Sequence, residues 1–163
     1  MKTLLLMRHA KSSWKDSSLK DIDRPLNKRG QKAAPRMGEK LKEVGLKPQA
    51  ILSSPALRAR DTAEMVAKKS GFKKDVRLID SFYMGEPDAY LHEIVQLPDD
   101  LDRVLVIGHN PGLEAFMQIL TREIEALPTA AIANLSLPVE HWSELTLQTA
   151  GKLEALFSPK EKD

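Results

Sequence analysis

The sequence contains no cysteine and no long hydrophobic run. Without cysteine there is no disulfide scaffold, no thiolate nucleophile and no thiolate metal ligand. No segment approaches the ~20 apolar residues that a membrane-spanning helix needs, so we expect no membrane partner. The 25 basic and 23 acidic residues leave a net charge of +2, without the basic excess of a nucleic-acid-binding protein. We therefore expect no nucleic-acid partner, and a cytoplasmic location fits.

The composition provides enough apolar material for one domain. Of the 163 residues, 42% are hydrophobic and 29% are charged, and this balance argues against intrinsic disorder. A chain of this length has room for one large core, so we expect a single domain over residues 1–157 and a charged tail over 158–163. The apolar run at the amino terminus is interrupted too early for a signal peptide, by Arg8, His9 and Lys11. A buried first strand explains it better.

Short apolar runs alternate with segments of helical periodicity. Continuous apolar runs are typical of strands covered on both faces, and we expect strands at 4–7, 50–52, 76–79, 104–107, 131–137 and 152–157. Helices are expected at 27–44, 55–69, 88–97 and 111–121. Asn27 would cap the first helix, and Pro35 would kink or restart it. This alternation predicts an α/β fold, a three-layer α/β/α sandwich with a mainly parallel central sheet.

Two strand-to-helix junctions share one pattern. Residues 52–55 (LSSP) and 107–111 (IGHNP) each run from a strand through a polar residue to a proline. With Ser54 and Asn110 as caps, Pro55 and Pro111 would occupy the first helical position, which proline favours. Both helices would then begin at the carboxyl edge of the sheet, where open α/β sheets bind ligands. Because helix N-termini favour anions, this edge is predicted to bind one.

Four basic side chains are expected at the same edge of the sheet. Arg8 and His9 follow the first strand and His109 follows a later one. Arg58 lies near the start of the second helix, from which it can lean back over the edge. Each residue alone is as well explained by a structural role, such as a pair within its own helix. Together, two arginines and two histidines from three segments favour a site for a phosphoryl group.

Four segments, in this order, resemble the histidine phosphatase superfamily and, within it, the small SixA-like phosphohistidine phosphatases. They are 7–12 (MRHAKS), 24–30 (RPLNKRG), 53–62 (SSPALRARDT) and 108–111 (GHNP). The Arg-His pair alone is a weak signal, whereas the ordered set is specific. The resemblance implies the phosphoglycerate mutase-like form of the sandwich, a single histidine phosphatase domain over 1–157, and no metal or organic cofactor.

The resemblance also implies a role for each matching residue. His9 would be the nucleophile that accepts the phosphoryl group as a covalent phosphohistidine. Three residues would hold the phosphoryl oxygens in the transition state, namely Arg8, Arg58 and His109. This assignment agrees with phosphoryl-transfer chemistry, which needs an in-line nucleophile and fixed positive donors. Nearby cations would keep the pKa of His9 below its usual value, so that the imidazole stays neutral.

Two weaker candidates for phosphate binding flank these segments. Arg24 would either reach the rim of the pocket or pair with Asp21 or Asp23 at the surface. Asn110 would face the phosphate through its backbone N–H. Ala10 departs from the pattern, because many members of the superfamily carry glycine there.

The region after the third strand indicates the substrate class. Members that act on sugar phosphates supply a carboxylic acid from it, whereas here 79–86 reads IDSFYMGE without a clear match. Asp80, Glu86 and Asp88 are available, but spacing fixes none of them. An imidazole leaving group needs less help from an acid, so the missing motif favours a phosphohistidine-bearing protein as substrate. The alternative is a phosphatase of small phosphomonoesters, such as sugar or nucleotide phosphates, with the same nucleophile.

Two other classes fit the sequence less well. A metal-dependent hydrolase would use His9, His109 and Asp80 as ligands, but Arg8 and Arg58 would repel the cation. A phosphoprotein- or nucleotide-binding module without turnover would have no need of a nucleophile at His9.

Overall fold

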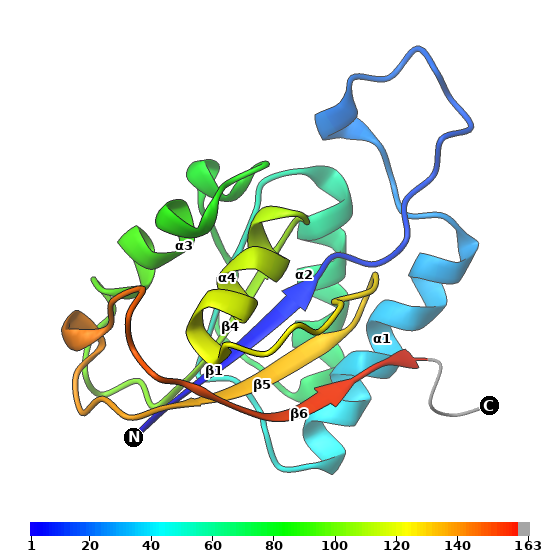
Figure 1. The fold of residues 1–163 in the computed structure, drawn as a ribbon. Helices are drawn as coiled ribbons and strands as arrows, with labels where there is room; N and C mark the ends of the chain where they lie inside the picture. Colours follow the sequence, from blue (N-terminus) through cyan, green and yellow to red (C-terminus); the bar gives the residue numbers. More distant parts are fainter. Residues whose placement is uncertain (160–163) are drawn as a thin grey trace.

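A central sheet separates two helical layers in this computed structural model, which describes residues 1–159 (Figure 1). Within these residues the strands are β1 (Lys2–Arg8), β2 (Ala50–Ser53), β3 (Arg77–Leu78), β4 (Arg103–Gly108), β5 (Ile132–Leu137) and β6 (Lys152–Phe157). The α-helices are α1 (Lys28–Glu43), α2 (Leu57–Ser70), α3 (Pro87–Ile94) and α4 (Gly112–Thr121). The strand order is β3-β2-β4-β1-β5-β6. Strands β1 to β4 are parallel and β5 is antiparallel to both neighbours, which confirms the predicted fold class.

Strand β1 lies in the middle of the sheet and is buried on both faces. Leu4 and Leu6 belong to the core under α3 and α4, whereas Leu5 and Met7 belong to the core under α1 and α2. All four side chains are fully buried. The continuous apolar run in the sequence is therefore the signature of a strand between two helical layers, as predicted.

The ends of several helices differ from the sequence-based prediction. Helix α1 runs through Pro35 as one element, so the expected restart is wrong. Buried residues on both sides of Pro35, among them Ala34 and Met37, pack against the sheet and α2 and hold the helix together. Helix α3 ends at Ile94 rather than Leu97. Of the predicted tail, residues 160–163 lie outside the described residues.

The prediction that prolines open α2 and α4 is also wrong. Helix α2 begins at Leu57 and α4 at Gly112, each without a side-chain cap. Ser54 Oγ instead accepts the N–H of Ala56, so the chain makes a turn before the intrahelical bonds begin at Ala56. Pro111 is the N-cap residue of α4. The first N–H groups of both helices are consequently not bonded to a capping side chain.

A long segment leaves the sheet between β1 and α1, and Figure 1 shows it (in blue) projecting beyond the layers. It contains a short 3-10 helix, η1 (Asp21–Asp23). Its two ends are held together by an isolated bridge between Ser12 and Leu26 and by the N–H of Asn27, which donates to Lys11 O. Gly30 permits this closure, because a side chain there would collide with the Lys11 carbonyl. The segment thus brings η1 to the carboxyl end of β1.

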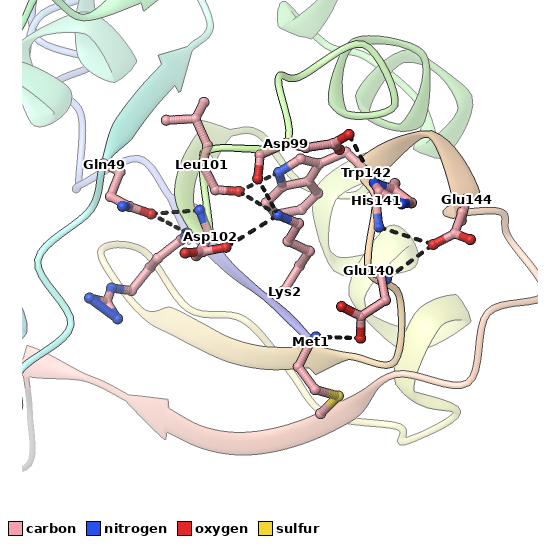
Figure 2. A network of polar contacts seen from close by, with 11 residues as sticks. Met1, Lys2, Gln49, Asp99, Leu101, Asp102, Glu140, His141, Trp142 and Glu144 are labelled. Atoms are coloured by element: carbon pink, nitrogen blue, oxygen red, sulfur yellow. Dashed lines mark hydrogen bonds and ion pairs between the residues drawn. The ribbon is translucent and has the colours of Figure 1, made fainter.

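The amino end of β1 is fixed by a buried lysine (Figure 2). Lys2 is 3% exposed, and its Nζ donates to the carbonyls of Asp99 and Leu101 and to Asp102 Oδ1 at 2.8, 3.0 and 3.2 Å. Trp142 Nε1 donates to the same Leu101 carbonyl at 2.7 Å. A buried charge is stable only when it is paired and hydrogen-bonded in this way. This network therefore has a structural role at the end of β1 opposite to His9.

No helix among residues 1–159 is long and apolar enough to cross a membrane.

Candidate active site

A cavity of about 420 Å³ opens at the carboxyl end of β1. Its lining includes every residue predicted for the site, namely Arg8, His9, Arg24, Arg58, His109 and Asn110. These residues come from the ends of β1 and β4, from the projecting segment and from the first turn of α2. Because β1 and β4 are parallel neighbours, with Arg8 beside Gly108, their next residues are brought together. The predicted convergence is confirmed, whereas the roles of these residues stay predictions.

His9 has a defined tautomer. Its Nδ1 lies 2.7 Å from the carbonyl oxygen of Ala10, and since a carbonyl only accepts, the ring proton is on Nδ1. The Nε2 atom keeps its lone pair. Burial, together with the charges of Arg58 and Arg8, lowers the pKa of His9 to about 4. The imidazole is therefore neutral at pH 7, as predicted, although burial rather than the neighbouring cations is the larger cause.

The second histidine, His109, lies against the first. The two rings are 5.1 Å apart, and His109 Nε2 is 2.7 Å from Ser54 Oγ. Burial, followed by the proximity of His9 and Arg58, lowers the pKa of His109 to about 3. Its Nδ1 is buried and has no partner within the described residues. If the Ser54 hydroxyl donates to Nε2, the proton of His109 is on Nδ1 and can be donated to a bound oxygen.

We expect the low pKa of both histidines to be measurable. The ring of His9 should stay neutral from pH 8 to pH 5 and titrate near pH 4 in an NMR titration of the labelled protein. Unfolded histidines titrate near ~6.5, so the unfolded chain binds more protons than the native chain below that pH. Stability should therefore fall as the pH drops from ~6.5 through about 4. The signal that is lost in His9→Gln is the resonance of His9. A pKa near ~6.5 for that resonance would contradict the expected lowering of the pKa by burial.

The two arginines nearest the histidines are partly without partners. The Nε atoms of Arg8 and Arg58 are buried, and neither has a hydrogen-bond partner within the described residues. An unpaired buried donor is costly, and such a donor beside a helix N-terminus is well placed for an anion. Arg58 is only the second residue of α2, close to the uncapped N–H groups. These donors favour a bound phosphoryl group.

Asp21 lines the cavity, whereas the sequence analysis considered it only as a surface partner of Arg24. Its carboxylate accepts from Arg24 Nε at 3.0 Å, from Arg58 Nη2 at 3.0 Å and from the Tyr83 hydroxyl at 2.6 Å. Its backbone oxygen also accepts from Arg58 Nη1 at 2.7 Å. The bond from Tyr83, together with the two arginines, holds the pKa of Asp21 well below its usual range. We call this arrangement of Asp21, Arg24, Arg58 and Tyr83 the arginine clamp.

Sequence reasoning could not find the clamp, because the clamped residues are far apart. Asp21 and Arg58 are separated by 37 positions, and only the path of the projecting segment joins them. Arg24 lines the cavity and also pairs with Asp21, although it is buried rather than at the surface as the second alternative expected. Its guanidinium lies 3.5 Å from the centre of the Trp14 ring, and Trp14 is 76% exposed at the rim.

Asn110 occupies the cavity wall but is not the predicted helix cap. Its Nδ2 donates to the Leu127 carbonyl at 2.9 Å and to Glu114 Oε2 at 3.3 Å. The backbone N–H of Leu127 donates to the same Glu114 oxygen at 2.7 Å. The side chain of Asn110 therefore ties the 127–129 segment to α4, and its Oδ1 is buried without a partner in the described chain.

None of the three acids considered from the sequence lines the cavity. Asp80 begins the 3-10 helix η2 (Asp80–Phe82), Glu86 is the N-cap residue of α3, and Asp88 lies in its first turn. Glu86 lines a neighbouring hollow instead. Among the described residues that line the cavity, Asp21 is the only carboxylate. Because the clamp keeps Asp21 ionised, it has no proton to donate.

Comparison with known proteins agrees with this geometry. The family description "histidine phosphatase superfamily (branch 1)" matches residues 4–83. An uncharacterised chloroplast protein of Arabidopsis thaliana is 38% identical over 96% of this chain and 77% of its own length. The chain belongs to the histidine phosphatase superfamily.

Two solved structures place it within the superfamily. A candidate phosphohistidine phosphatase SixA from Nakamurella multipartita is 30% identical, with a TM-score of 0.83 over 97% of this chain and 96% of that chain. A candidate SixA from Agrobacterium tumefaciens is 26% identical, with the same TM-score over 97% and 98% of the two chains. Both similarities extend over the whole domain, so this histidine phosphatase is of the SixA-like branch.

Proposed function

We propose that this phosphatase removes the phosphoryl group from phosphohistidine on a protein, through a covalent phosphohistidine at His9. The observation that carries the proposal is the combination of a neutral imidazole at His9 with a cavity whose single described carboxylate is ionised in the arginine clamp. The cavity therefore offers a nucleophile and cations but no acid. This suits a leaving group that departs without protonation by the enzyme.

In the first step, the Nε2 lone pair of His9 attacks phosphorus, and a P–N bond forms. The P–N bond of the substrate breaks, and its electron pair stays on the substrate nitrogen. The substrate imidazole can already carry a proton on its other nitrogen, so it leaves as a neutral ring. Arg8, Arg58 and the Nδ1–H of His109 stabilise the charge on the three equatorial oxygens.

In the second step, water attacks the phosphorus held on His9, and the P–N bond to Nε2 breaks. The electron pair returns to Nε2, and both protons of the water remain on the phosphate that is released. The hydrogen bond from Nδ1–H to the Ala10 carbonyl keeps the His9 ring in the same tautomer throughout. His9 is thus a good nucleophile and a good leaving group, which divides one difficult hydrolysis into two easier transfers.

The similarity to proteins described as candidate phosphohistidine phosphatases supports this substrate. A phosphomonoester would leave as an alkoxide, which needs a proton at the transition state. Asp80, Glu86 and Asp88 do not line the cavity, which counts against the small-phosphomonoester alternative. Glu86 lines a hollow that shares Met84 and Asn110 with the cavity, so the Glu86→Gln variant tests whether it supplies that proton.

A substrate panel tests the proposal. We expect kcat/KM for a phosphohistidine peptide to exceed that for phosphoserine peptides and sugar phosphates by at least ~10²-fold, the usual contribution of a general acid. Asp80→Asn and Glu86→Gln should leave phosphohistidine turnover nearly unchanged, and EDTA should have no effect. Arg60→Gln, on the exposed face of α2, is the matched control. Equal rates on phosphomonoesters, or a large loss in either acid variant, would overturn the assignment in favour of a small-phosphomonoester phosphatase.

A further inference from the structure

A second hollow adjoins the catalytic cavity along helix α1. It has a volume of about 290 Å³. Its lining is basic and contains no acidic residue: Lys11, Arg29, Lys32 and Arg36 contribute the charges, and Thr129 and Pro128 contribute part of the wall. Lys11 and Thr129 line both this hollow and the catalytic cavity, so the two share part of their wall. We call the four cations and their walls the basic groove.

The charges of the basic groove are not neutralised by the fold. The side chains of Lys11, Arg29, Lys32 and Arg36 are exposed, and within the described residues none of them forms an ion pair. By contrast, Arg24 and Arg58 in the cavity are both paired with Asp21. Without these four residues the net charge of the chain would change from +2 to −2. These four cations therefore form a cluster of positive charge beside the catalytic cavity.

The placement of these cations is unfavourable for α1 itself. Arg29, Lys32 and Arg36 are spaced three and four residues apart, on one face of the helix, where like charges repel. Arg29 and Lys32 also lie in its first half, and its first turn contains no acidic residue, although the N-terminal end of a helix favours negative charge. Local stability therefore does not explain this face. Such conflicts with local preference are characteristic of functional surfaces.

We propose that the basic groove binds acidic residues that flank the phosphohistidine of the protein substrate. The inference rests on the proposed function for the phosphoryl end of the substrate. When the phosphohistidine of the substrate lies in the cavity at His9, the substrate polypeptide on one side of it passes Lys11 and Thr129. It then enters the basic groove. Aspartate or glutamate side chains there meet four cations that have no ion-pair partner within the described residues. The groove thus recognises the surroundings of the phosphohistidine, whereas the cavity recognises the phosphoryl group.

The test compares three substrates of equal phosphoryl chemistry. These are a phosphohistidine peptide flanked by four glutamates, the same peptide with glutamines in their place, and free phosphohistidine. The groove variant combines Arg29→Gln, Lys32→Gln and Arg36→Gln, which leaves every cavity residue intact. The charge-matched control combines Lys68→Gln, Lys73→Gln and Lys74→Gln, which lie at or beyond the C-terminal end of α2.

At low salt the groove variant should lose about tenfold or more in kcat/KM on the glutamate peptide, because charges at the rim of a binding site mainly steer association. It should change little on the other two substrates. Salt should reduce the rate on the glutamate peptide for the native protein and not for the groove variant, because exposed charges are screened. The control variant should behave as the native protein does.

Three results would overturn the inference. They are an equal loss on all three substrates, an unchanged rate on the glutamate peptide, or an equal loss in the control variant. Inhibition by a single-stranded oligonucleotide of the same charge, as strong as that by the unphosphorylated glutamate peptide, would assign the groove to nucleic acid instead. If the native protein turns over none of the substrates, the proposed function fails. Weaker binding of the unphosphorylated glutamate peptide to the groove variant, measured by fluorescence anisotropy, then still tests the groove.

Discussion

Replacing His9 with alanine is expected to abolish turnover, with a loss of at least ~10⁴-fold in kcat, as is typical when an enzyme loses its covalent nucleophile. Rapid quenching of the native enzyme with labelled substrate should trap a phosphoryl group that is labile in acid and stable in alkali. Mass spectrometry should locate it on His9. The variant should carry no label, because the remaining residues of the cavity can bind a phosphoryl group but cannot accept it.

The structure explains why His9, and not His109, should carry the label. The rings are only 5.1 Å apart, so proximity to the substrate does not distinguish them. The single ring proton of His9 is on Nδ1, which donates a hydrogen bond to the Ala10 carbonyl, so the lone pair on Nε2 stays free. His109 Nε2 is instead 2.7 Å from the Ser54 hydroxyl. If that hydroxyl donates, the ring proton of His109 is on Nδ1, and His109 has no lone pair free for attack, in contrast to His9.

The control for this experiment is His141→Ala. His141 pairs with Asp99 at 2.9 Å in the network at the amino end of β1 (Figure 2), away from the cavity lining. The control should keep both the label and the activity. Label on His109, or near-normal turnover by a folded His9→Ala protein, would show that His9 is not the nucleophile. Thermal unfolding of each variant separates loss of chemistry from loss of structure.

Much of the fold could be predicted because its signals are local. The four apolar residues of β1 divide between two cores, and a short continuous apolar run is typical of a strand covered on both faces. Strand ends then located Arg8, His9 and His109, because parallel strands end at one edge. The helix starts were wrong because Ser54, which resembles a cap, bonds His109 and the Ala56 N–H instead. The contact with His109 thus outweighs the local tendency of Ser54 to cap a helix.

The remaining parts of the site depend on contacts that no local pattern encodes. The arginine clamp forms because the projecting segment returns to α1, where Asn27 and Gly30 close on Lys11. That return path sets the position of Asp21. The basic groove has a similar origin, because in the sequence Arg29 resembles any exposed cation on a helix. Only the adjacent 128–129 and 158–159 segments make it part of a hollow.

Replacing Arg58 with alanine is expected to lower kcat/KM by at least ~10²-fold, the usual loss when a single transition-state donor is removed. Arg58 is 3% exposed, its Nε has no partner within the described residues, and its two terminal nitrogens are held by Asp21. The guanidinium is therefore fixed before the substrate arrives, and little reorganisation is needed. Asp21→Ala should produce a smaller loss, because the cation remains but is free to move.

Inhibition by vanadate distinguishes the direct role of Arg58 at the phosphoryl group from the role of Asp21 in positioning Arg58. Since vanadate imitates the five-coordinate phosphorus of the transition state, its inhibition constant should rise in Arg58→Ala by a factor similar to the loss in kcat/KM. In Asp21→Ala the inhibition constant should rise less and kcat should change more than KM, because Asp21 positions Arg58 and does not itself touch the phosphoryl group. Arg60→Ala, two residues along α2 and exposed, should change neither quantity. Unaltered kinetics and vanadate inhibition in a folded Arg58→Ala protein would mean that Arg58 serves only to hold the projecting segment against α2 through Asp21.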